Sequence, residues 1–392
     1  MTERADVVIA GGGVMGCAVA YFLAADPDFD GTVLVVERDW SYAVATTPRS
    51  WGGIRQQFST PENVRMGLFG IEFVRQAAET LAVGDDKPDL AFRERGYLFL
   101  ASAAGLPVLE ANVRLQRGLG AEVTLLSPAE IAGRCPWLNV EGLAGAGYGP
   151  RNEGWLDPAS LMQAFRRKAR DLGAEIIEDE VVGVTVDRGR VAGVALKRRG
   201  PVACGTLVNA AGPQAGALAR LAGVALPVVP RKRMTYVFDC REDLGEAPLT
   251  IDVTGVAFRP EGRQYLAIVS PPAERDPDTE DLEPEYELFE ETIWPALAAR
   301  VPAFEAIKLT NAWAGLYDYN SFDQNAIIGP HPELGGLLFC NGFSGHGLQQ
   351  APAAGRAVAE LIVHGMYRSL DLTALGYQRI SEDRPLKEAN VV

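Results

Sequence analysis

A glycine-rich turn near the start of the chain constrains the fold more than any other feature. Residues 6–10 predict a short buried strand, and Gly11, Gly13 and Gly16 follow it in the spacing G-x-G-x-x-G. Residues 17–25 then predict an apolar helix. In this order the glycines allow a tight turn, close approach of the backbone to a pyrophosphate and close packing of helix on strand. The helix N-terminus adds unpaired N–H groups and a partial positive charge, which favour a phosphate.

The second strand of this unit ends on an acidic residue. Residues 32–36 predict the strand, and Glu37 follows it, 21 residues after Gly16. A carboxylate here accepts hydrogen bonds from a ribose 2′-OH and argues against a 2′-phosphate, so NADP is disfavoured. The complete unit therefore predicts a dinucleotide site. The alternative is a tight turn that binds nothing.

Composition limits the class of protein. A chain of 392 residues exceeds the usual size of one core, so we expect two domains. The net charge of −14, without an extended Lys/Arg stripe, argues against nucleic acid and anionic membranes as partners. The five scattered cysteines show no metal-binding spacing, and the first strand leaves no room for a leader peptide, so we expect a cytoplasmic protein. No apolar run approaches the roughly 18 residues that a membrane-spanning helix needs.

An arginine stands just beyond a glycine pair in the segment after the dinucleotide unit. Residues 41–49 predict a loop that returns over the nucleotide, and Gly52 and Gly53 allow the backbone to approach a flat group. Arg55 has two interpretations at this point. It is either one partner of a surface salt bridge or a clamp that binds a carboxylate with its planar guanidinium.

The remaining chain predicts a mixture of helices and strands. We expect helices over 61–81, 106–119, 157–172, 292–301 and 348–364, and a further helix that begins at Ser127 with a capping box. We expect strands over 90–93, 96–101, 174–177, 181–186, 191–196, 202–210, 234–239, 255–258, 265–269, 309–316 and 335–340. The acidic stretch 274–291 is interpreted as a solvated helix face. The glycine-rich loop 341–347 forms, with the strand before it and the helix after it, a second place where a helix N-terminus favours an anion.

Several of these stretches together resemble the D-amino-acid oxidase (DAO) superfamily of FAD enzymes. They are the glycine fingerprint, SWGGIRQQF at 50–58, NAAG at 209–212, WAGLYDYN at 313–320 and GFSGHG at 342–347. The chain is most similar to the branch of sarcosine oxidase β-subunits, dimethylglycine dehydrogenase and FAD-dependent oxidoreductase-domain proteins. The resemblance implies an α/β fold, with a doubly wound, glutathione-reductase-type FAD domain and an α+β, sheet-based substrate domain. We expect the FAD domain at 1–86, 148–228 and 322–392, and the substrate domain at 87–147 and 229–321.

The resemblance also implies a set of residues that bind FAD. They are Gly11, Gly12, Gly13, Val14, Met15, Gly16, Glu37, Arg38, Thr46, Thr47, Gly52, Gly53, Ile54, Arg55, Val181, Ala210, Ala211, Gly212, Gly315, Gly342, Phe343, Ser344, Gly345, His346, Gly347, Leu348 and Gln349. Four residues are expected at the reaction site. Arg55 would hold a substrate carboxylate, Tyr317 would close the cavity, His346 would shape the flavin environment rather than transfer a proton, and Gln349 replaces a substrate-binding lysine.

Two departures from related enzymes change the expected chemistry. Residues 314–316 contain no cysteine and residues 41–58 no histidine, so neither known tether to flavin is present and FAD is expected to be non-covalent. No lysine occurs between positions 233 and 307, where monomeric oxidases carry an oxygen-activating lysine. An acceptor other than O₂ is therefore compatible with the sequence, and the expected partner is either O₂ or another electron acceptor.

Three functions are compatible with these observations. The leading hypothesis is an FAD-dependent amine oxidoreductase that oxidises the C–N bond of a small secondary or N-methyl amino acid by hydride transfer to flavin N5, giving an imine that hydrolyses. The second is a flavin-binding assembly or scaffold protein, or a subunit of a flavin dehydrogenase complex, with little activity of its own. The third is an NAD-dependent dehydrogenase, because the first fingerprint is shared.

Overall fold

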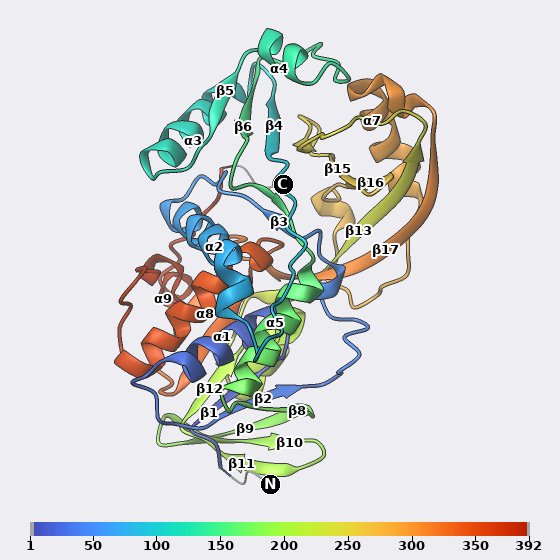
Figure 1. Cartoon of the computed structure of the whole chain (residues 1–392). Helices are drawn as coiled ribbons and strands as arrows, with labels where there is room; N and C mark the ends of the chain where they lie inside the picture. Colours follow the sequence, from blue (N-terminus) through green and yellow to red (C-terminus); the bar gives the residue numbers. More distant parts are fainter. Residues whose placement is uncertain (1–3, 390–392) are drawn as a thin grey trace.

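The computed structural model describes residues 4–389, and two large sheets organise it (Figure 1). The first sheet has six strands in the order β18-β19-β12-β1-β2-β8. In that order its strands are Ile327–Pro330, Leu337–Asn341, Thr206–Asn209, Val7–Ala10, Val33–Glu37 and Glu175–Glu178. All neighbours pair parallel except β18 with β19. This is the doubly wound sheet that the sequence predicts.

Helices cover one face of this sheet and a smaller sheet covers the other. The helices are α1 (Val14–Ala25), α2 (Pro61–Thr80), α5 (Pro158–Asp171) and α8 (Gly347–His364), and they contact one another around α1 and α8. The smaller sheet consists of β9 (Val181–Asp187), β10 (Arg190–Leu196) and β11 (Gly200–Ala203). Alternation along the strands divides the core accordingly, because Val7 and Ile9 pack on the helix side and Val8 and Ala10 on the other.

The second large sheet has eight strands in the order β17-β13-β16-β15-β14-β4-β6-β5. In that order they are Ile307–Asn320, Val228–Cys240, Gln264–Ile268, Ala257–Glu261, Leu249–Ile251, Tyr97–Ala101, Gly145–Gly149 and Thr124–Leu126. Helices α3 (Leu106–Gly118), α4 (Pro128–Arg134) and α7 (Trp294–Arg300) accompany it (Figure 1). The expected fold class, a doubly wound FAD-type domain with a second sheet-based domain, is confirmed. The exact residue ranges of the two domains stay a prediction.

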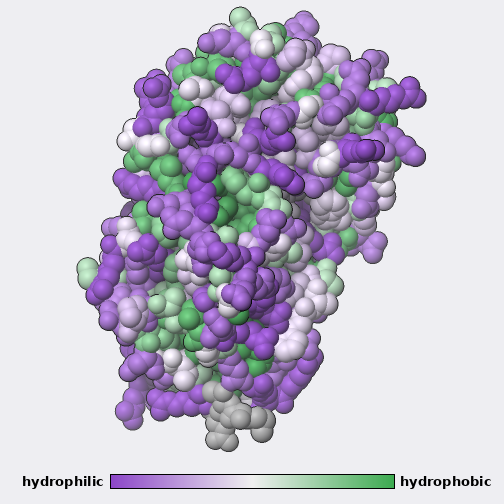
Figure 2. Space-filling model, in the orientation of Figure 1, coloured by the Kyte–Doolittle hydropathy of each residue, from purple (hydrophilic) through white to green (hydrophobic). Residues whose placement is uncertain are grey.

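Short elements complete the described chain. Strands β3 (Gly53–Ile54) and β7 (Gly154–Trp155) form a separate two-stranded sheet. The helices α6 (Ala215–Leu221) and α9 (Gln378–Ser381) are short. Among the described residues no helix combines the length and apolarity that crossing a membrane requires. The face in Figure 2 is largely hydrophilic, with apolar areas between the hydrophilic residues.

Several predicted elements are wrong in detail. Residues 90–93 form no strand, because only Arg93 makes an isolated bridge, to Trp155. The strand expected over 202–210 is two strands, since the chain leaves β11 before it enters β12. The acidic stretch 274–291 is mostly irregular and not a solvated helix face. Its carboxylates instead form ion pairs with the basic residues 231–233 of β13.

The predicted glycine turn shows why two of its glycines are required. A Cβ atom on Gly16 would lie 1.9 Å from the carbonyl oxygen of Gly11, so only glycine allows α1 to pack this closely on the turn. Gly11 has φ of +106°, and a Cβ atom there would lie 2.3 Å from the carbonyl oxygen of Ala210. The turn therefore brings α1, β1 and the end of β12 together.

A buried carboxylate near the end of the described chain holds the start of α2. Glu388 is 7% exposed, and its carboxylate accepts hydrogen bonds from the backbone N–H and hydroxyl groups of Ser59 and Thr60 and from Nδ2 of Asn63, at 2.5–3.2 Å. The hydroxyl of Thr60 makes no cap bond to the helix. Glu388 therefore supplies the negative charge that favours a helix N-terminus.

We predict that Glu388→Ala lowers the free energy of unfolding by about 3 kcal/mol, because it leaves several buried donors without an acceptor. Urea unfolding at a fixed, saturating concentration of FAD measures the change. The matched control is Glu382→Ala, which removes an exposed carboxylate and should lower the free energy of unfolding far less. Equal losses in the two variants would contradict this role of Glu388.

Candidate functional site

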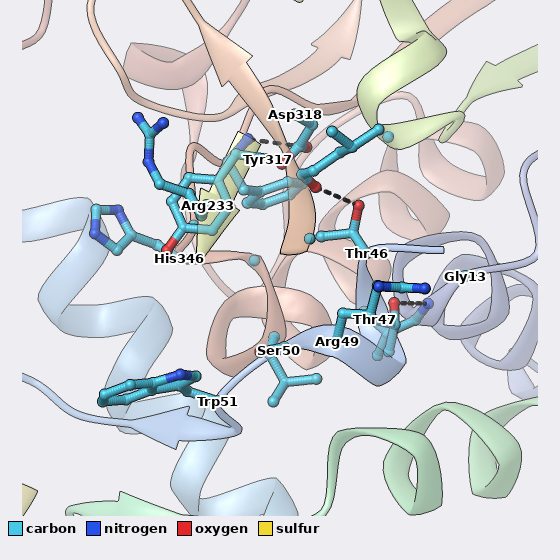
Figure 3. Close-up of a pocket in the computed structure, with 18 of the residues that line it drawn as sticks. Gly13, Thr46, Thr47, Arg49, Ser50, Trp51, Arg233, Tyr317, Asp318 and His346 are labelled. Carbon is cyan, nitrogen blue, oxygen red and sulfur yellow. Dashed lines mark hydrogen bonds between the residues drawn. The ribbon is translucent and has the colours of Figure 1, made fainter. Parts of the chain in front are cut away.

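One cavity opens between the two large sheets, and both glycine-rich loops line it. Figure 3 shows Arg233, Tyr317 and His346 on one side of it and Gly13, Thr46 and Thr47 on the other. The cavity-lining residues that the sequence analysis named are Gly11, Gly13, Val14, Met15, Glu37, Arg38, Thr46, Thr47, Gly53, Arg55, Ala210, Ala211, Gly212, Gly315, Tyr317, Phe343, Gly345, His346, Gly347, Leu348 and Gln349. Segments separated by hundreds of residues thus meet at a single site.

Seven of the named residues do not line the cavity. They are Gly12, Gly16, Gly52, Ile54, Val181, Gly342 and Ser344. Several of them shape its walls from behind. The N–H of Gly12 donates to Glu37 at 2.7 Å, Gly52 has φ of +73° and lies against the Leu156 carbonyl, and the Ser344 hydroxyl accepts from the N–H of Asn320 at 2.9 Å. The expected contact of the Val181 backbone with adenine stays a prediction.

Two helix N-termini open into the cavity. Gly13 and His346 are the N-cap residues of α1 and α8, and neither provides a side-chain cap. Neither helix has an acidic residue in its first turn. Val14 and Met15 at the start of α1 line the cavity, and so do Gly347 and Leu348 at the start of α8. The partial positive charges of the two helix N-termini therefore favour anionic groups at two separate places.

The carboxylate of Glu37 lies at the end of β2, where the sequence predicts it. Its Oε2 accepts from the N–H of Gly12 at 2.7 Å, and its Oε1 accepts from the N–H of Asp39 at 3.0 Å. Glu37 is 8% exposed and lines the cavity. These bonds orient the carboxylate, which keeps lone pairs for ribose hydroxyls.

Arg55 is buried and is not part of a surface ion pair. Its side chain is 8% exposed, and Nε and Nη2 have no hydrogen-bond partner. Its Cζ atom lies 4.9, 5.8 and 5.4 Å from the ring centres of Phe58, Tyr97 and Phe99. The backbone N–H of Arg55 donates to Oε1 of Gln349 at 2.7 Å. Of the two interpretations, the geometry supports the clamp, because an unpaired buried guanidinium that lines a cavity attracts an anion.

A second buried carboxyl group stands behind this segment. Glu153 accepts from the backbone N–H of Gln56 at 2.7 Å and from Nε2 of Gln57 at 2.7 Å. Burial raises the pKa of Glu153 to about 8, against the lowering effects of these hydrogen bonds and of Arg55. Glu153 does not line the cavity, so it holds the chain after Arg55 rather than a ligand.

His346, Tyr317 and Gly345 form a compact group in the last loop. Burial, and to a smaller extent the positive charge of Arg55, lowers the pKa of His346 to about 3, so the imidazole is neutral at pH 7. Its ring meets Phe58 edge to face at 5.4 Å. Burial raises the pKa of Tyr317 above its ordinary value. A Cβ atom on Gly345, whose φ is +97°, would lie 2.4 Å from the Tyr317 ring, so the ring rests on the glycine.

Part of the cavity lining was not predicted from the sequence. Arg233 and Thr235 of β13 line it, and so do apolar residues of the strands beside it: Leu249, Ile251, Ala257 and Ile268. Arg233 forms a two-pronged ion pair with Asp276, at 2.6 and 2.9 Å, and lies over the Tyr317 ring at 5.2 Å. The available signal was charge complementarity between the basic residues 231–233 and the acidic stretch that follows.

These features define the class of protein. A doubly wound sheet, two helix N-termini without a first-turn acid facing one cavity, and a buried acid at the second strand fit an adenine dinucleotide with a long anionic and polar surface. This donor set suits FAD. The family model described as DAO, FAD dependent oxidoreductase, matches residues 6–361. The chain therefore belongs to the DAO family of FAD-dependent oxidoreductases, and FAD is its cofactor.

Individual relatives agree with this assignment. The chain is 47% identical to the FAD-dependent oxidoreductase domain-containing protein 1 of Bos taurus over 412 residues, which cover 96% of this chain and 85% of the relative. It is 29% identical to the mitochondrial sarcosine dehydrogenase of Homo sapiens, over 93% of this chain but 40% of that protein. Among solved structures, L-proline dehydrogenase from P. horikoshii superposes with a TM-score of 0.87 at 27% identity, covering 98% of this chain and 100% of that chain.

We predict that the buried Glu153 makes stability depend on pH. The folded state binds the proton of this group more tightly than the unfolded chain, whose value is near 4.5, so its contribution to stability falls as the pH rises toward about 8. The free energy of unfolding of the parent and of Glu153→Gln is measured from pH 6 to pH 9. As the pH rises, the variant should become more stable relative to the parent.

The control for this experiment is Glu360→Gln. Glu360 is also buried, at 5% exposed, but hydrogen bonds from Ser369 and Arg368 outweigh burial and lower its pKa. It stays ionised throughout this pH range, so the difference between Glu360→Gln and the parent should not change with pH. A parallel pH trend in both variants would contradict the assignment to Glu153.

We predict that Gly345→Ala weakens FAD binding at least tenfold, because the new Cβ atom must displace the Tyr317 ring and the loop before α8. Fluorescence titration of the apoprotein with FAD measures the dissociation constant. Gly365→Ala is a matched control, since Gly365 also has a positive φ but meets no atom within 4 Å of an added Cβ. If the control weakens FAD binding equally, the steric argument fails.

Proposed function

We propose that this flavoprotein oxidises the C–N bond of a small secondary or N-methyl amino acid, producing an imine that hydrolyses. The observation that carries the proposal is Arg55, a buried arginine without an ion pair that lines the cavity shared by both glycine loops. An amino acid carboxylate would neutralise that charge. The sarcosine dehydrogenase relative, at 29% identity, supports the same substrate class.

Different residues of the cavity would bind the substrate and orient it. Arg55 binds the carboxylate, and the rings of Phe58, Tyr97 and Phe99 hold its guanidinium in place. Gln349 fixes the backbone of Arg55 through Oε1 and therefore acts as a positioning residue. Tyr317 covers the cavity beside Arg233. Fixing the substrate by its carboxylate sets the orientation of the C–H bond that reacts.

Local electrostatics indicate how protons and negative charge are handled in the cavity. FAD, when bound, supplies the acceptor for the hydride of the substrate C–H bond. The neutral His346 is a poor proton carrier at pH 7, so the amine is expected to enter the cavity in its neutral form. The N–H groups at the start of α8, at Gly347 and Leu348, face the cavity and favour negative charge there.

Anaerobic reduction of the bound flavin tests the proposal. N-methyl amino acids should bleach the visible flavin band, whereas N-methyl amines of the same size without a carboxylate should not. Failure of every N-alkyl amino acid would contradict the proposed activity. A stable protein partner together with a flavin that stays oxidised would instead favour an assembly or scaffold role.

We predict that Arg55→Met lowers kcat/KM for an N-methyl amino acid by about 10²–10³-fold, because the substrate carboxylate loses its buried partner. Arg55→Lys should lower kcat/KM by a smaller factor, since the charge remains but the planar guanidinium does not. Stopped-flow flavin reduction measures both. Arg65→Met, at an exposed arginine of α2, is the control and should leave the rate unchanged. An Arg55→Met variant with parental kcat/KM would exclude the clamp.

A further inference from the structure

An apolar row crosses the second large sheet beside Arg55. Strand pairing places Phe99 of β4 opposite Ile251 of β14, Ile251 opposite Ala257 of β15, and Ala257 opposite Ile268 of β16. Residues paired in this way point to the same face of a sheet, with adjacent strands about 4.8 Å apart. Ile251, Ala257 and Ile268 all line the cavity. The row therefore forms one continuous wall, with Leu249 beside Tyr97 completing it.

This apolar wall begins where the carboxylate clamp ends. The Cζ atom of Arg55 lies 5.4 Å from the Phe99 ring and 5.8 Å from the Tyr97 ring, and these rings pair with the first residues of the wall, Ile251 and Leu249. An amino acid held at Arg55 by its carboxylate therefore directs part of its remaining atoms along the wall.

Charged groups near the wall are already neutralised. Arg233 is paired with Asp276, and both side chains are 7% exposed. Arg259 lies on the same face of β15 as Ala257, but it is paired with Glu261 and covered by the rings of Trp51 and Trp155. A second charged group on a substrate would lose water here without gaining an unpaired partner.

We infer that the substrate carries an aliphatic side chain, and that N-alkyl or cyclic secondary amino acids with such side chains are oxidised in preference to sarcosine. This inference rests on the proposed function and names its substrate class. Sarcosine leaves the wall in contact with water. Each methylene group buried against it contributes about 0.8 kcal/mol, which corresponds to about a fourfold gain in kcat/KM.

A substrate series tests the inference with the intact holoprotein. The series contains sarcosine, N-methylalanine, N-methylvaline, N-methylleucine, proline and N-methylaspartate, with both enantiomers where they exist, and the rate of anaerobic flavin reduction gives kcat/KM. We expect a rise of at least tenfold from sarcosine to N-methylleucine, and N-methylaspartate below N-methylalanine. Sarcosine or N-methylaspartate as the best substrate would overturn the inference. If no member of the series reduces the flavin, the proposed function itself is contradicted.

Substitutions in the wall distinguish an effect on substrate preference from a general effect on folding. Ile251→Ala should reduce the ratio of kcat/KM for N-methylleucine to that for sarcosine by about tenfold. Leu98→Ala is the matched control, because Leu98 is a fully buried leucine on the opposite face of β4 and its loss should not change the ratio. Ala257→Leu provides a second test if Ile251→Ala fails to bind FAD, since it fills the wall and should also lower the ratio. An unchanged ratio in the folded wall variant would contradict the inference.

Discussion

A buried positive charge without a negative partner organises the site. Removing a guanidinium from water is costly, and the faces of three aromatic rings offset only part of the cost for Arg55. The surrounding chain therefore has to hold Arg55 in place. Gln349 fixes its backbone, Glu153 fixes the two residues after it, and Glu388 fixes the helix that follows. An anion bound at Arg55, as the proposed function requires, would offset the free energy lost by burying this charge.

The cavity is locally positive in a protein whose net charge is −14. Two helix N-termini and Arg55 supply this potential, while carboxylates of the acidic stretch 274–291 form ion pairs with the basic residues of β13. The first-turn residues of α1 and α8 include no acid that would compete for the N–H groups. Placement of charge, rather than its total, therefore favours the anionic groups of the cofactor and, in the proposed function, the carboxylate of the substrate.

Local sequence signals predicted the parts of the structure that depend on local geometry. The glycine turn, the capping box at Ser127 and the long helices each rest on a few adjacent residues, and the structure has them. The fate of Arg55 depended instead on rings from residues 58, 97 and 99, which only the tertiary fold brings together. The acidic stretch was misjudged for the same reason, since its partners lie on a strand more than forty residues earlier.

The apolar wall illustrates the limit of sequence reasoning most clearly. Phe99 and Ile251 are adjacent only because β14 pairs with β4, and a shift of one residue in that register would turn Ile251 away from the cavity. No periodicity within either strand contains this information. The glycine loops of the cavity and the strands that form the wall are therefore under separate structural constraints. The wall can change in size or polarity by substitution on one sheet face, without altering the glycine turns.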